Sequence, residues 1–135
     1  MNNFKEKADN YLHKGGDVFF ARSGATVGKT FQFKDYEKVT CFAGYSIKVT
    51  PKPNIIISDF LYFFMRSGSH ENWKRSIFNQ ATIQNIGADK YSFLDVSTPP
   101  VEEQQSNVNH IETKWTRINA KVARIKQFDK TVGRI

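Results

Sequence analysis

The segment 22-RSGATVGKT-30 contains residue types that can cradle a phosphate group. It ends in Gly-Lys-Thr and follows the apolar run 18-VFFA-21, which is typical of the strand that precedes a nucleotide-binding loop. Such a loop needs four residues between its first glycine and the Gly-Lys-Thr, because that spacing lets successive backbone N–H groups converge on the phosphates. Gly24 and Gly28 enclose only three residues, so the spacing is wrong for this chemistry.

The residues after Gly28 also disfavour a nucleotide-binding enzyme. A phosphate-binding loop leads directly into the N-terminus of a helix. Here Phe31 and Phe33 alternate with polar residues, and this period of two is typical of a strand. We therefore predict a hairpin with strands over 17–23 and 27–33, and an ATP- or GTP-binding enzyme becomes the least favoured of three hypotheses.

The polar side chains of this hairpin suit DNA. Glycines let the chain reverse at positive φ, and the turn then presents hydroxyl and cationic groups that can bind phosphates and base edges. The candidates are Arg22, Ser23, Thr26 and Lys29. The alternative is an ordinary turn with solvated side chains, since loops are polar by default.

Strands and short helices are predicted to position this hairpin. Residues 39–50 are predicted to form one or two buried strands, interrupted at Gly44 and closed by a turn over 51-PKPN-54. Ser58 is predicted to N-cap a largely buried helix over 59–67. Together these elements predict the α+β fold class.

A second helix, more polar than the first, is predicted to follow. Gly68 is predicted to end the preceding helix, and 69-SHENWKRSIF-78 then has the composition of a polar helix. The side chains expected on the basic surface of the two helices are Arg66, His70, Lys74 and Arg75. Of these we predict that Arg66, Lys74 and Arg75 hold DNA phosphates, as Lys29 does.

The segment 79-NQATIQNIGADKYSF-93 is rich in side chains that both donate and accept hydrogen bonds. Asn and Gln can bind adenine through two hydrogen bonds, so we predict base contacts here, together with Arg22. The candidates are Asn79, Gln80, Gln84 and Asn85. The alternative is a polar loop whose amides satisfy backbone groups. The following 94-LDVSTPP-100 is predicted to be a short strand that ends at a proline pair.

Beyond the prolines, 101-VEEQQSNVNHIETKWTRINAKVARIKQF-128 is predicted to form a long helix. Its apolar residues repeat at alternating spacings of three and four, as in the seam of a coiled coil. They are Val108, Ile111, Trp115, Ile118, Val122 and Ile125. The seam is narrow and has basic residues beside it, which favours a partner helix. The alternative is that the helix folds back on its own domain.

Composition limits the classes of function. The net charge is +7 with a pI near 9.6, which favours a polyanionic partner such as nucleic acid. A single Cys41 and the dispersed His13, His70 and His110 predict no metal site, and no cofactor is expected. The longest apolar run, 60-FLYFFM-65, is too short to span a bilayer, and the N-terminal residues are too polar for a signal peptide. We therefore expect a cytoplasmic protein without a membrane partner.

In their order along the chain, four segments resemble the DNA-specificity subunit of type I restriction-modification systems. They are 16-GDVFFARSGATVGK-29, 60-FLYFFMRSGSHENW-73, 82-TIQNIGADKYSFLDVSTPPVEEQ-104 and the long helix after them. The resemblance implies a β-rich α+β target-recognition domain with short helices and no catalytic residues, followed by a long C-terminal coiled-coil helix. It implies double-stranded DNA and the methyltransferase and restriction subunits as partners. It also implies a homodimer, or pairing with another specificity subunit, through the C-terminal helix.

On this basis residues 1–98 are expected to form a partial DNA target-recognition domain and residues 99–135 a spacer or dimerisation helix. The strands that the family has before a segment like that at Gly16 are missing, so we expect a half-sized subunit from a truncated or divided gene. The first hypothesis is a non-catalytic, sequence-specific DNA-binding component. The alternative is a truncated interaction module that pairs through its C-terminal helix with an intact specificity subunit without reading DNA itself.

Overall fold

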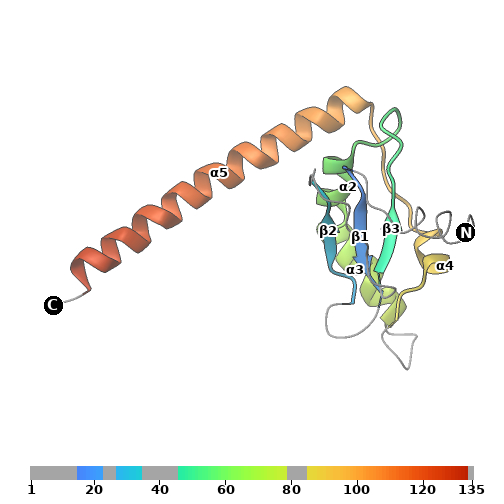
Figure 1. The fold of residues 1–135 in the computed structure, drawn as a ribbon, viewed down its shortest axis with the longest axis horizontal. Helices are drawn as coiled ribbons and strands as arrows, with labels where there is room; N and C mark the ends of the chain where they lie inside the picture. Colours follow the sequence, from blue (N-terminus) through green and yellow to red (C-terminus); the bar gives the residue numbers. More distant parts are fainter. Residues whose placement is uncertain (1–14, 23–26, 35–45, 79–84, 134–135) are drawn as a thin grey trace, which may run out of the picture.

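The computed structural model describes residues 15–22, 27–34, 46–78 and 85–133, which form a small sheet, short helices and one long C-terminal helix (Figure 1). The strands are β1 (Val18–Ala21), β2 (Thr30–Gln32) and β3 (Ser46–Val49). The helices are α2 (Ser58–Phe64), α3 (Gly68–Phe78), α4 (Ala88–Tyr91) and α5 (Val101–Val132). The predicted α+β fold class is confirmed.

β1 is the central strand of the antiparallel sheet that the described residues form, with the order β2-β1-β3. Phe19 of β1 lies opposite Phe31 of β2 on one side and opposite Lys48 of β3 on the other. All of β1 is buried, because its residues are apolar and a strand pairs with each of its edges. The predicted β1–β2 hairpin is confirmed, although β2 is shorter than the strand predicted for residues 27–33.

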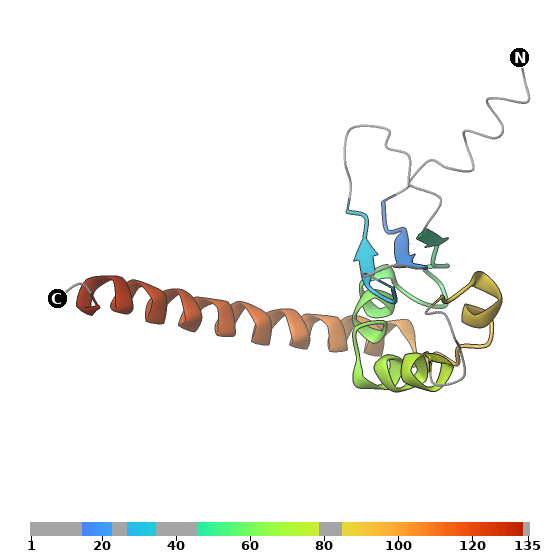
Figure 2. The same cartoon turned by 90° about the horizontal axis from the view of Figure 1, so that it is seen from below.

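Helices α2 and α3 lie together on one side of the sheet (Figure 2). Val18 and Phe20, alternate residues of β1, form the buried core with Leu61 and Met65, which are one helical turn apart. Alternate strand residues and residues four apart on a helix each share one face, so the two elements present matching apolar surfaces. Burial of such side chains contributes about 1.5–3 kcal/mol each, which holds the helices against the sheet.

Ser58 has a different role from the helix cap that its position predicts. The N-cap residue is Ile57, and Ser58 is the first residue of α2. The Ser58 hydroxyl donates a hydrogen bond to the Gly16 carbonyl at 2.6 Å and accepts one from Gln32 Nε2 at 2.9 Å. The cap prediction is wrong because these long-range bonds engage the hydroxyl and tie α2 to the open end of the hairpin.

The first helix ends earlier than predicted. Its last residue is Phe64 rather than Ser67, and a turn over residues 65–67 follows. The Ser67 hydroxyl accepts a hydrogen bond from the His70 N–H at 3.5 Å, which is the role of an N-cap for α3. Gly68 is the first residue of α3, so the prediction that Gly68 ends the preceding helix is wrong.

Residues 85–100, before α5, contribute side chains that cover the core. The Tyr91 ring stacks on Phe20 with 4.9 Å between ring centroids, and Leu94 packs against the core. The short helix α4 was not predicted, and the strand predicted over residues 94–100 is wrong. In this segment packing of Tyr91 and Leu94, rather than strand pairing, determines the path of the chain.

Helix α5 begins against the domain and then extends away from it (Figure 1). Gln104 and Val108 are buried, whereas every described residue after Val108 is exposed. The predicted long helix is confirmed, and the alternative that it folds back on its own domain is wrong beyond Val108. None of the helices in the described part of the chain is both long enough and apolar enough to cross a membrane.

Candidate nucleic-acid interface

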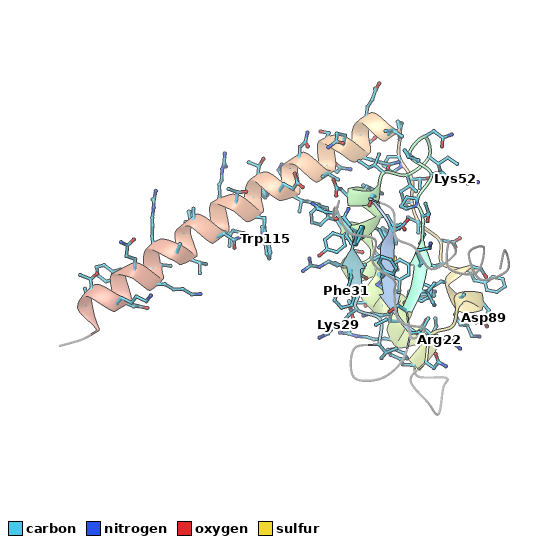
Figure 3. The ribbon with its side chains drawn as sticks, viewed as in Figure 1. Arg22, Lys29, Phe31, Lys52, Asp89 and Trp115 are labelled. Atoms are coloured by element: carbon cyan, nitrogen blue, oxygen red, sulfur yellow. The ribbon has the colours of Figure 1, made fainter. Side chains whose placement is uncertain are left out.

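The hairpin brings two predicted DNA-binding side chains to one end of the sheet. The Gly28 N–H donates to the Ala21 carbonyl at 2.8 Å, and the Ala21 N–H donates to the Lys29 carbonyl at 2.9 Å. Gly28 has a φ of 74°, a conformation that glycine adopts without strain. Arg22 and Lys29 are therefore fixed at the same end of the sheet, and both side chains are exposed (Figure 3).

Two later segments meet the hairpin at this end. The Ile86 N–H donates to the Arg22 carbonyl at 3.0 Å, which places the exposed Asn85 next to the hairpin. Lys74 of α3 donates from Nζ to the Gly28 carbonyl at 3.4 Å. Predicted phosphate-binding and base-reading positions that are distant in sequence therefore come together at this end of the sheet, which we call the basic end.

Lys74 is buried, so the prediction of a solvent-facing side chain at this position is wrong. Its ammonium group forms an ion pair with Glu71 at 2.5 Å in addition to its bond to Gly28. The hydrogen bond from Lys74 holds the pKa of Glu71 below its ordinary value. A Cβ atom on residue 28 would collide with Lys74 Cδ, so the lysine stem packs directly on the glycine. Lys74 thus packs against the hairpin at Gly28 and holds it in place.

A pocket of about 440 Å³ opens between β2 and the α2–α3 turn. Three cationic side chains and one carboxylate line it, together with the aromatic side chains Phe31 and Tyr62. The charged residues are Lys29, Arg66, Lys74 and Glu71. The excess of positive charge favours an anionic group, and Phe31, which is 53% exposed, allows apolar contact beside it.

Arg66 is held at the rim of this pocket by Tyr62, one helical turn before it. Its guanidinium donates a hydrogen bond to the Tyr62 hydroxyl at 2.7 Å and lies 5.2 Å from the centre of the tyrosine ring. Both the hydrogen bond and the cation–π contact limit the rotation of an otherwise exposed side chain. Arg66 can therefore meet an anion with a smaller loss of conformational entropy than a free surface arginine.

His70 belongs to the interior rather than to the predicted basic surface. Its side chain is buried and stacks on Trp73, with 5.5 Å between ring centroids. Desolvation by burial lowers the pKa of His70, which favours the neutral ring. In the described part of the chain, no group of three or more His, Cys, Asp or Glu side chains could hold a metal ion.

The other predicted site residues divide into two sets. Arg75 is exposed on α3, next to the buried Lys74. Ser23, Thr26, Asn79, Gln80 and Gln84 lie outside the described residues. Phe31 and Tyr62 at the pocket were not predicted, because the alternation of Phe31 and Phe33 with polar residues predicts a strand but does not reveal that Phe31 is exposed.

The predicted helix seam separates into a buried and an exposed part. Val108 is 1% exposed and packs within the domain, whereas Trp115 and Ile125 are each 60% exposed. Ile111, Ile118 and Val122 are also exposed. The exposed apolar surface continues through Phe128 and Val132, which the predicted seam did not include. Val132 follows Ile125 by seven residues and extends the heptad spacing, whereas Phe128 lies beside the seam. We call residues 109–132 the outer part of α5.

The model of the type I restriction modification DNA specificity domain family matches residues 1–127 of the chain. The match covers most of the sequence, and the chain belongs to this family. Its general role is that of a specificity component of a type I restriction-modification system, whose general partners are DNA and the other subunits of such a system. Comparison with curated proteins finds no match.

Proposed function

We propose that this chain is the sequence-specific DNA-binding component of its restriction-modification system and has no catalytic residues of its own. It gives target recognition to the methyltransferase and endonuclease subunits. One observation carries the proposal: the hairpin turn, α3 and the segment at residues 85–86 converge at the basic end, where Arg22, Lys29 and Asn85 are exposed together. Cations next to an amide side chain supply both phosphate contacts and a means of reading bases.

The side chains at the basic end have separate roles in this proposal. Lys29 and Arg66, at the pocket, bind backbone phosphates, and Arg75 on α3 adds a further phosphate contact. Arg22 and Asn85 reach base edges, because guanidinium and amide groups can each form paired hydrogen bonds with a base. Lys74 keeps the hairpin turn in place rather than binding phosphate itself, because Glu71 and Gly28 already engage its ammonium group.

Further base and phosphate contacts are proposed for residues on either side of these positions. Ser23 and Thr26 lie between Arg22 and Lys29 in the sequence, and the three amide residues lie between α3 and Asn85. The amide residues are Asn79, Gln80 and Gln84.

The outer part of α5 provides the second half of the proposed function. Its exposed apolar seam has the heptad spacing of a helix that packs against another helix. We propose that it pairs with α5 of a second copy, so that each chain contributes one recognition unit, residues 1–98, and one spacer helix within residues 99–135. The assembly would then carry two DNA-binding ends. The half-sized subunit of the first hypothesis corresponds to one such unit.

The DNA-binding role is tested by the salt dependence of affinity for a random-sequence duplex of about 30 base pairs, because each phosphate contact changes the slope of log K against log salt by about 0.9. The variants are Lys29→Ala and Arg66→Ala. The matched control is Lys52→Ala, since Lys52 is an exposed lysine at the opposite end of the sheet (Figure 3).

The proposal predicts that each pocket variant lowers the slope by about one contact, or about 0.9, while Lys52→Ala leaves it unchanged. Equal slopes for all three variants and the unmodified protein would contradict the assignment of the basic end to DNA. The folded state of each variant is checked by its far-ultraviolet circular dichroism.

A second candidate function rests on the outer part of α5. Its apolar side chains are exposed over several turns, and such a surface is typical of an interaction site. The candidate is an interaction module that pairs with an intact specificity subunit and does not read DNA. It would be favoured if the chain forms helix-mediated assemblies but binds duplex DNA no more tightly at low salt than the Lys29→Ala/Arg66→Ala double variant.

A further inference from the structure

A polar side chain is fully buried where α5 begins. Gln104 has 0% of its surface exposed. Its Nε2 donates hydrogen bonds to the carbonyl of Ile55 at 2.8 Å and to the carbonyl of Pro99 at 2.7 Å, and its Oε1 accepts one from the Ile57 N–H at 3.0 Å. Both amide donors are thus used, together with one acceptor site of the oxygen.

These bonds join three parts of the chain at one point. Ile55 and Ile57 lie immediately before α2, Pro99 precedes α5, and Gln104 itself is in the first turn of α5. Val108 is buried one turn later on the same helix face, and α5 contacts α2. We call residues 101–108 the root of α5. The root is built into the domain, whereas the outer part is exposed along its whole length.

We infer that Gln104 is a positioning residue that fixes the direction in which α5 leaves the domain. Apolar contacts at Val108 and α2 resist separation, but they are non-directional and tolerate sliding and tilting. Hydrogen bonds weaken steeply when donor and acceptor lose alignment. Three bonds from one planar amide to three backbone groups therefore define an orientation, and breaking them would leave buried polar groups unsatisfied.

A small change of direction at the root of α5 becomes a large displacement at its far end. Gln127 lies roughly 35 Å along the axis from Gln104, because a helix rises about 1.5 Å per residue. A tilt of roughly 10° at the root would therefore move Gln127 by about 6 Å. Beyond Val108 no described residue of α5 is buried, so the root alone sets where the seam is presented.

The mechanical boundary of the domain therefore lies within α5. The root of α5 moves with the domain, and the independent spacer begins after Val108 rather than at residue 99. Its consequence for DNA rests on the proposed function: a fixed direction of α5 holds the basic end at a fixed distance from whatever packs on the seam. The direction itself is independent of DNA binding, so the test contains no DNA.

The test measures a distance within the full chain by pulsed electron paramagnetic resonance. Spin labels are placed at Asn72→Cys on α3 and at Gln127→Cys on the side of α5 away from the seam, in a Cys41→Ser background. Labelled protein is diluted into an excess of unlabelled protein, so that the measured distances are intramolecular even if α5 pairs. The variant is Gln104→Met, which keeps the length and helix propensity of the side chain but removes its hydrogen bonds. The control is Gln105→Met, because Gln105 is exposed on the next position of α5.

The expected result is one narrow distance distribution in the parent and in Gln105→Met, and a distribution broadened or displaced by several ångströms in Gln104→Met. An unchanged distribution in a folded Gln104→Met variant would overturn the inference, even if the melting temperature falls. If Gln104→Met does not fold, Gln104→Ala is used instead, because it removes the same hydrogen bonds and leaves room for water to reach the freed backbone groups. Failure of both variants to fold would also overturn the inference, since Gln104 would then determine the fold rather than the direction of α5.

Discussion

The compact domain and the outer part of α5 place similar side chains in opposite environments. Phe20 and Met65 are each 2% exposed, whereas Trp115 and Ile125 are each 60% exposed. The domain surrounds its apolar side chains with its own strands and helices. The outer part of α5 has an equally regular apolar pattern, but in the described chain nothing covers it.

The difference shows that apolar periodicity predicts which face of a helix will be buried without identifying what buries it. Most helical stability in proteins comes from packing of the apolar face, so an exposed seam of several turns is the surface that the proposed pairing with a second helix would cover. In the proposed function, the domain binds DNA through charge at its basic end, and the outer part of α5 binds a second helix through apolar contact.

The largest effect is expected on assembly. Trp115→Asp/Ile118→Asp places two charges on the seam, and we expect it to halve the solution mass measured by light scattering, because burial of unpaired charges in a helix interface is strongly unfavourable. The matched control is Thr113→Asp/Thr116→Asp, which adds the same charges away from the seam and should leave the mass unchanged. A parent protein that is already monomeric at all concentrations would contradict pairing between copies.

The next effect is on the stability of the domain. Phe20→Ala removes a buried aromatic ring and should lower the free energy of unfolding by about 3–5 kcal/mol, enough to unfold a marginally stable domain. Trp115→Ala removes an exposed ring and should change it by less than about 0.5 kcal/mol in dilute protein. Urea titration followed by tryptophan fluorescence measures both values, because Trp73 packs within the domain whereas Trp115 is exposed. Similar losses in the two variants would show that the outer helix also packs within one copy.

A smaller effect is expected from pH. The pKa of His70 is lowered by burial from its ordinary value of 6.5, so the unfolded chain binds a proton more readily than the folded domain. The contribution of neutral His70 to the free energy of unfolding should have its full value above pH 6.5. It should fall as the pH falls towards the lowered pKa of the folded state. His70→Phe should remove this slope, whereas His110→Phe, on the exposed outer helix, should retain it. Urea midpoints of both variants, measured between pH 7.5 and pH 5, test this assignment. A midpoint that still falls with pH in His70→Phe would contradict the role of His70.

The parts of the fold that follow from local periodicity could be predicted from sequence. The alternation around Phe31 predicts the hairpin, and the spacing from Val108 to Ile125 predicts α5. The role of Ser58 could not be predicted, because its partners at Gly16 and Gln32 lie far from it in the sequence. These long-range hydrogen bonds, rather than the local preference of serine for the N-cap position, determine the role of the Ser58 hydroxyl.

The candidate site could be predicted only in part. The residue types that suit DNA are evident from the sequence, and Arg22, Lys29 and Asn85 lie at one end of the sheet in the structure. The sequence does not reveal that the Lys74 side chain points inward, because its burial depends on the position of Gly28 against α3. A basic residue on a polar helix predicts a solvent-facing charge only where no other element lies over it.

Hydrogen–deuterium exchange of the full chain, with and without a random-sequence duplex, tests the central claim most directly. If DNA binds the basic end, peptides that contain residues 27–34, 66–78 and 85–88 should exchange more slowly with DNA, while the outer part of α5 should be unchanged. Protection confined to residues 109–132, or no protection at residues 27–34, would contradict the division of the molecule into a DNA-binding end and a protein-binding helix.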